Sequence, residues 1–189
     1  MSSKDPADTS QPHHVDVVPA AGGSWRTYGI QDGLPSLRVE DLAEDADGYL
    51  WLATSTAGVS RFDGDVFQTF GRDQGLSGNL AYAVHVDGQQ RLWVGTLDGG
   101  LCRYAGGRFL SCPADLSGPD RGVTHLYEDD DGALWVGGRG VLGWHDGEAY
   151  HDLYAECRRA VGHTADVSCW GIVRDAQGVV WFGFASVIS

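Results

Sequence analysis

The sequence is poor in basic residues, in methionine and in long apolar runs. Its 189 residues include a single Met and 13 Lys and Arg against 26 Asp and Glu, which gives a formal net charge of −13. This charge argues against a nucleic-acid partner, whose phosphates bind through Lys and Arg, and against docking on anionic lipid. Because no run of about 18 apolar residues is present, no membrane-spanning helix is expected.

The chain also lacks an export signal and a paired-cysteine motif. Residues 1–24 are polar and rich in Pro, Asp and Ser, without the basic start and apolar stretch of a signal peptide, so they predict a disordered tail and a cytoplasmic protein. The cysteines form no C-x-x-C pair, which predicts free thiols in a reducing compartment instead of a zinc site or a disulfide framework. They are Cys102, Cys112, Cys157 and Cys169.

Glycine and tryptophan are abundant, at 28 and 7 residues, and four tryptophans recur almost periodically. Trp51, Trp93 and Trp135 are 42 residues apart, and Trp181 follows 46 residues after the third. An aspartate precedes each Trp by six positions, and in three copies a turn glycine precedes it by three: Gly48, Gly132 and Gly178. Self-similarity at this period indicates repeated structural units.

Each repeat contains four short apolar or alternating runs separated by Gly and Asp turns, which predicts four strands. In the first copy the runs are Val39–Glu44, Tyr49–Thr54, Val59–Phe62 and Val66–Phe70. Four-stranded units of about 42 residues are typical of β-propeller blades. We therefore predict an all-β fold over residues 25–189, with about four tandem blades in an incomplete ring and each repeated Trp in the core between blades. The repeats lie roughly at 39–79, 80–122, 123–166 and, truncated, 167–189.

The sequence motif of these repeats resembles the two-component regulator propeller repeat. The resemblance rests on Asp32–Ser36, on Glu44, Asp45, Gly48, Leu50, Trp51, Thr54, Gly58, Arg61 and Phe62, and on their counterparts in later copies. It implies a ligand-sensing propeller of the kind found in hybrid histidine kinases, response regulators and diguanylate cyclases. Such a propeller passes its occupancy to an output domain. No catalytic or nucleotide-binding motif is present, so neither enzyme activity nor a cofactor is expected of this chain.

The last repeat stops before its third strand, which predicts a fragment of a larger receptor without its output domain. Three alternatives remain open at this point. Copies of the chain could complete a ring by assembling through exposed blade edges, four blades could close a compact ring, or the propeller could be a lyase or hydrolase. Unpaired edges and an exposed blade face favour association.

Positions that differ between otherwise equal blades are free to carry function. Five residues before each turn aspartate the copies have Glu40, Tyr82, Thr124 and Trp170, and Arg38 lies two residues before the first of them. These five side chains are our candidate site for an unidentified small molecule, glycan or protein, the alternative being ordinary variation at a solvated rim. The acidic turns resemble the start of a calcium loop, but their recurrence in every copy favours hairpin turns, and no metal site is predicted.

Overall fold

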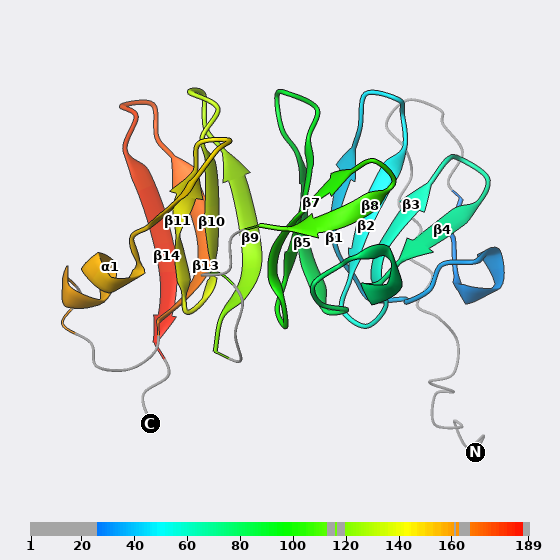
Figure 1. The fold of residues 1–189 in the computed structure, drawn as a ribbon, viewed down its shortest axis with the longest axis horizontal. Helices are drawn as coiled ribbons and strands as arrows, with labels where there is room; N and C mark the ends of the chain where they lie inside the picture. The colour runs from blue at the N-terminus through cyan, green and yellow to red at the C-terminus, as the bar shows by residue number, and fades with distance from the viewer. Residues whose placement is uncertain (1–25, 113–115, 117–119, 161, 163–166, 187–189) are drawn as a thin grey trace, which may run out of the picture.

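A computed structural model describes residues 26–112, 116, 120–160, 162 and 167–186. The predicted tail at residues 1–24 lies outside the described residues. The strands form antiparallel blades that follow one another along the chain, and Figure 1 shows them in a row with the first blade and the last hairpin at opposite ends. The prediction of tandem propeller blades in an incomplete ring is confirmed, since the described blades do not close on one another.

The first blade agrees with the predicted strands to within one residue at every end. It contains β1 (Val39–Glu44), β2 (Leu50–Thr54), β3 (Gly58–Phe62) and β4 (Phe67–Phe70), paired in that order. Two short 3-10 turns precede blades 1 and 2, η1 (Ile30–Asp32) and η2 (Arg72–Gln74). Four of the five side chains of β2 are buried, so alternation of buried and exposed side chains is weak, as its apolar run predicts.

The second and third blades repeat this arrangement. Blade 2 contains β5 (Ala81–Val86), β6 (Leu92–Thr96), β7 (Gly100–Ala105) and β8 (Arg108–Ser111). Blade 3 contains β9 (Gly122–Glu128), β10 (Leu134–Arg139), β11 (Val141–His145) and β12 (Tyr150–Asp152). The chain then forms a hairpin of β13 (Val167–Arg174) and β14 (Val180–Ser186), which joins β10 through the single pair Arg139–Ser168.

One helix interrupts the β pattern and was not predicted. It is α1 (Tyr154–Ala160), in the connection between β12 and β13, where it accounts for the longer interval between the third and fourth repeated tryptophans. The helix lies beside blade 3 at the outer end of the row (Figure 1). In the described part of the chain, no helix has both the length and the apolar character needed to cross a membrane.

The core lies between the blades, around the repeated tryptophans. Trp51 is 2% exposed and its ring lies 5.0 Å from Tyr104 of blade 2, while Trp93 is 1% exposed and its ring lies 4.9 Å from His145 of blade 3. Trp181 departs from the prediction of a core residue: it is 60% exposed, because no described blade packs on that face. The core prediction therefore holds where a following blade is present.

Glycine two positions after the tryptophan allows the blades to approach. A Cβ on Gly95 would lie 2.5 Å from Val123 Cγ1 of the next blade, and one on Gly137 would lie 2.8 Å from the Sγ of Cys169. Both distances are too short for real Cβ contacts, so the small residues in these strands are required by blade packing.

An aspartate fixes each tryptophan from its own hairpin turn. The Trp51 indole N–H donates to Asp45 Oδ2 at 2.7 Å, and Asp45 Oδ1 accepts the backbone N–H groups of Asp47 and Tyr49. The same bond from indole to carboxylate occurs in the other three repeats at 2.7 to 2.8 Å. A turn aspartate that bonds its own backbone explains the repeated motif as structure.

Candidate ligand-binding site

A β-bulge occurs at the same place in the innermost strand of every repeat. The register with the neighbouring strand shifts around Glu40 in β1, Tyr82 in β5, Thr124 in β9 and Trp170 in β13. A bulge inserts one unpaired residue and turns its side chain away from the regular pleat. The four predicted positions are therefore the re-aimed residues of four equivalent bulges, on strands that pack side by side along the row.

Two of the candidate residues, Arg38 and Glu40, form an ion pair at the bulge of blade 1. Arg38 Nε lies 2.6 Å from Glu40 Oε1, and the two side chains are 70% and 19% exposed. The arginine therefore reaches into solvent while the carboxylate is largely covered. Because the arginine side chain is mostly open to water, the contribution of this ion pair to stability is small.

Blade 3 and the final hairpin form a second group of candidates. Thr124 Oγ1 lies 2.9 Å from His125 Nδ1, and the His125 ring lies 6.3 Å from the Trp170 ring in an edge-to-face arrangement. Trp170 is 60% exposed. A solvent-facing indole beside a hydroxyl and an imidazole offers both an apolar face and hydrogen-bonding groups.

The five predicted residues are not all in contact. Arg38 and Glu40 pair on blade 1, Thr124 and Trp170 meet through His125, and Tyr82 is half-buried on the strand between them. The structure thus supports two groups along one edge and places Tyr82 in the intervening blade.

Sequence reasoning missed Asp41 and His125, which follow the bulge residues of blades 1 and 3. Asp41 Oδ2 accepts the Val84 N–H at 3.0 Å and so ties β1 to β5. Burial lowers the pKa of His125, and the Asp41 charge and the Cys169 backbone partly oppose this shift. The signal was available, since the position after the bulge also varies among repeats, with Asp41, Ala83, His125 and Gly171.

The carboxylates of the acidic turns accept hydrogen bonds from the protein's own backbone and tryptophan N–H groups. Asp129 Oδ1 accepts two backbone N–H groups and its Oδ2 accepts the Trp135 indole N–H at 2.8 Å. Burial opposes ionisation, yet these bonds, led by that from Trp135, leave the pKa of Asp129 lowered. Among the described residues, no three His, Cys, Asp or Glu side chains gather as a metal site would require.

The cysteines are free thiols, as the sequence predicts. Burial raises the pKa of Cys112 to about 11 and also raises the pKa of Cys169. Protonated thiols are weak nucleophiles, so these two residues act as packing side chains near neutral pH.

Comparison with known proteins agrees with the repeat analysis. Residues 33–56, 75–98 and 117–140 match the model of the two-component regulator propeller family. No curated protein matches the chain in sequence.

Solved structures show the same fold. The extracellular domain of the hybrid two-component system BT3049 from B. thetaiotaomicron has a TM-score of 0.67 at 17% identity, over 84% of this chain and 22% of that one. The extracellular domain of BT4673 from the same organism has a TM-score of 0.64 at 22% identity, over 78% of this chain and 20% of that one. The chain therefore spans about a fifth of the length of these sensor domains.

An enzyme shares the fold as well. Virginiamycin B lyase from Staphylococcus aureus has a TM-score of 0.56 at 15% identity, over 79% of this chain and 50% of that one. At such identities the likeness shows the fold alone. The cytoplasmic location expected from residues 1–24 finds no support in these comparisons, because the two matched sensor domains are extracellular.

Proposed function

Because the chain carries repeats of the two-component regulator propeller family, we propose that it is a non-catalytic ligand-recognition module of a signalling receptor. Its bulge residues form the contact edge, and occupancy is passed to an output domain in the rest of the receptor. The observation that carries this proposal is the recurrence of one bulge in four blades with four different side chains.

The chemistry of this edge favours a glycan as the ligand. Trp170 offers an exposed aromatic face, and Thr124 and Glu40 offer a hydroxyl and a carboxylate on the neighbouring inner strands. Sugar rings present C–H faces that stack on indole and hydroxyls that need polar partners. A bulge that changes from Glu to Tyr to Thr to Trp gives each blade a different contact.

The test uses the protein as given and a panel of soluble neutral and acidic disaccharides. Binding is followed by tryptophan fluorescence and by the shift in thermal unfolding temperature. We expect Tyr82→Ala to weaken binding by about ten-fold, because it removes the whole ring. Trp170→Phe should weaken binding by a smaller factor, because the phenyl ring offers a smaller stacking face than the indole.

Trp181→Phe is the matched control, because Trp181 and Trp170 are both 60% exposed and belong to the same hairpin. Binding that survives both Tyr82→Ala and Trp170→Phe contradicts the proposal. Failure of every disaccharide to bind contradicts the glycan assignment.

A further inference from the structure

Equivalent pockets lie between successive blades, and they differ in chemistry. The pocket between blades 1 and 2 has a volume of about 220 Å³ and is lined by Trp51, Arg61 and Tyr104 among others. The pocket between blades 2 and 3 has a volume of about 270 Å³ and is lined at the same repeat positions by Trp93, Arg103 and His145. The first pocket can therefore be compared with the second, position by position, to separate residues that the fold requires from residues that differ.

In the first pocket the arginine is fully used by the fold. Arg61 donates to Gln68 Oε1 at 2.8 Å, and its guanidinium lies 4.4 Å from the Tyr49 ring and 5.7 Å from the Trp51 ring. It is a structural cation that joins three strands of blade 1.

In the second pocket two of the partners of that arginine, the glutamine and the tyrosine, have changed. Leu110 lies opposite Arg103, where Gln68 lies opposite Arg61, and Arg91 stands at the repeat position of Tyr49. Within the described residues, Arg103 has no hydrogen-bond, ion-pair or ring partner. Its half-buried guanidinium therefore faces the pocket without a counter-charge of its own.

His145 is the second departure from the repeat. By strand register the equivalent residues are Phe62 in blade 1 and Tyr104 in blade 2. In blades 2 and 3 the ring at this position packs on the tryptophan of the preceding blade. Packing explains a ring at this position but does not require an imidazole. His145 is 4% exposed and lines the pocket.

The tautomer of His145 is set by its own turn. Gly147 N–H donates to His145 Nδ1 at 2.9 Å, so the neutral ring carries its proton on Nε2. No described residue accepts a hydrogen bond from Nε2. Burial lowers the pKa of His145, and the charges of Arg91 and Arg103 act in the same direction while Asp146 opposes them, so the neutral donor form is favoured.

From this geometry we infer that the pocket between blades 2 and 3 binds a small organic carboxylate, with Arg103 and His145 Nε2–H as its polar contacts. Guanidinium pairs with carboxylate through two parallel N–H bonds. Trp93, Leu110 and Cys112 supply an apolar wall for the organic part. This site is separate from the bulge edge and does not rest on the proposed function.

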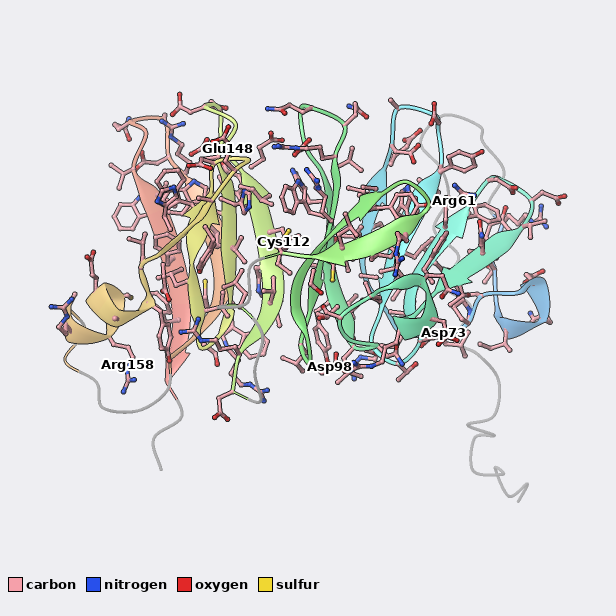
Figure 2. All side chains as sticks on the ribbon, in the orientation of Figure 1. Arg61, Asp73, Asp98, Cys112, Glu148 and Arg158 are labelled. Atoms are coloured by element: carbon pink, nitrogen blue, oxygen red, sulfur yellow. The ribbon has the colours of Figure 1, made fainter. Side chains whose placement is uncertain are left out.

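The local charges favour a monoanion. Arg91 is already paired with Asp87 through Nε, at 2.5 Å, so Arg103 is the arginine that has no ion-pair partner among the described residues. Glu148 is exposed and adds a negative charge to the pocket lining, which disfavours a dianion such as phosphate. Figure 2 labels Glu148 and Cys112 in the region where the second and third blades meet.

The experiment titrates acetate and D-glucuronate into the protein, with D-glucose and inorganic phosphate as comparison probes, at constant ionic strength. Binding is followed by calorimetry and by the imidazole NMR resonances of His145. We expect one or both carboxylates to shift the His145 Nε2 resonance and glucose to leave it unchanged. Arg103→Gln should weaken binding by at least about ten-fold, since it removes a charge-assisted hydrogen-bond pair.

Three further variants distinguish carboxylate binding in this pocket from effects of substitution elsewhere in the protein. Arg61→Gln is the matched control and should leave carboxylate binding unchanged, because Arg61 occupies the same repeat position in the other pocket. His145→Phe restores the ring found in blade 1, so it should fold and yet bind several-fold more weakly. Glu148→Gln should tighten binding.

Failure of both carboxylates to bind overturns the inference. So does binding that survives Arg103→Gln, or phosphate that binds more tightly than either carboxylate. A variant that loses binding counts only if its thermal transition remains cooperative, and His145→Phe provides this check independently of the arginine.

Discussion

Residues at equivalent repeat positions are buried at the interfaces between blades and exposed on the two outer faces of the row. Trp93 and Trp181 each donate their indole N–H to a turn aspartate at 2.7 Å. Trp93 is 1% exposed and Trp181 is 60% exposed. The hairpin fixes the orientation of the ring, and the following blade decides whether the ring is buried.

Blade 1 has an exposed apolar face at the other end of the row. Leu42 and Leu50 are 59% and 40% exposed, and they border a pocket of about 390 Å³ that also includes Tyr28 and Phe67. In the interior of the row the corresponding surfaces are covered by the preceding blade. Local sequence therefore makes a blade, while stability is added at each interface between blades.

The largest test of this comparison is removal of the tryptophan ring. Trp93→Ala should lower the free energy of unfolding by about 3–5 kcal/mol, because it opens a cavity in a packed interface. Trp181→Ala should cost much less, because most of its ring is already in water. Denaturant titration of both variants measures the difference, and equal losses would contradict the role assigned to the blade interface.

The next test removes the carboxylate that holds the ring. Asp87 is buried, accepts N–H groups from Trp93, Gln89 and Arg91, and forms an ion pair with the Arg91 guanidinium. Asp87→Ala should lower the free energy of unfolding by about 3 kcal/mol, since it leaves buried donors and a cation unpaired. Asp175→Ala, in the exposed hairpin, should have a clearly smaller effect in the same titration.

Asp87 also predicts acid sensitivity. Burial raises the pKa of the Asp87 carboxyl, but the hydrogen bonds from Trp93 and Arg91 outweigh burial and leave this pKa lowered. A carboxyl with a lowered folded pKa contributes stability above its unfolded pKa, near 3.9, and this stability is lost as the pH falls toward the folded value. The difference between the native protein and Asp87→Asn should therefore shrink below about pH 4, as measured by denaturant titration at several pH values.

A smaller effect is expected at the interface between blades 2 and 3 in mildly acidic solution. The pKa of His145 is lowered by burial, so below about pH 6.5 the unfolded chain binds a proton that the folded chain does not. The native protein should lose stability relative to His145→Phe as the pH falls from 7 to 5, by at most about 1.4 kcal/mol per pH unit. Parallel stability curves for the two proteins would contradict this expectation.

The smallest predicted change concerns the turn of blade 2. Gln90 has a φ of 61°, where the other repeats have glycine, and its side chain accepts the Ala46 N–H of blade 1 at 3.1 Å. Gln90→Gly relieves a left-handed conformation that is unfavourable for a residue with a Cβ, and it also removes this exposed hydrogen bond, so we expect a net stabilisation below about 1 kcal/mol. The reverse change Gly48→Gln is the control and should destabilise the protein by a similar amount in thermal unfolding.

Much of the fold follows from the sequence because the signals are local and repeated. The strand boundaries of blade 1, the aspartate turns and the close approach at Gly95 all depend on neighbouring residues or on a small side chain. The helix α1 was missed because it occurs once, in a connection without a repeat to compare.

The candidate site was predictable as a set of positions and not as a set of contacts. Comparison of repeats located Glu40, Tyr82, Thr124 and Trp170, but their common bulge depends on strand register, which the sequence does not state. The contrast between Arg61 and Arg103 was also out of reach. It depends on which residue lies opposite on the next strand, Gln68 or Leu110.

The connection of the last hairpin to the rest of the protein has a consequence for its motion. Among the described residues, only the pair Arg139–Ser168 links β13 to the ladder of β10, although Cys169 also packs against Gly137. Regions with few shared hydrogen bonds open locally before the whole domain unfolds. Amide protons of β13 and β14 should therefore exchange with solvent ahead of those in β6 and β10, so the hairpin that carries Trp170 is the most readily rearranged unit of the row.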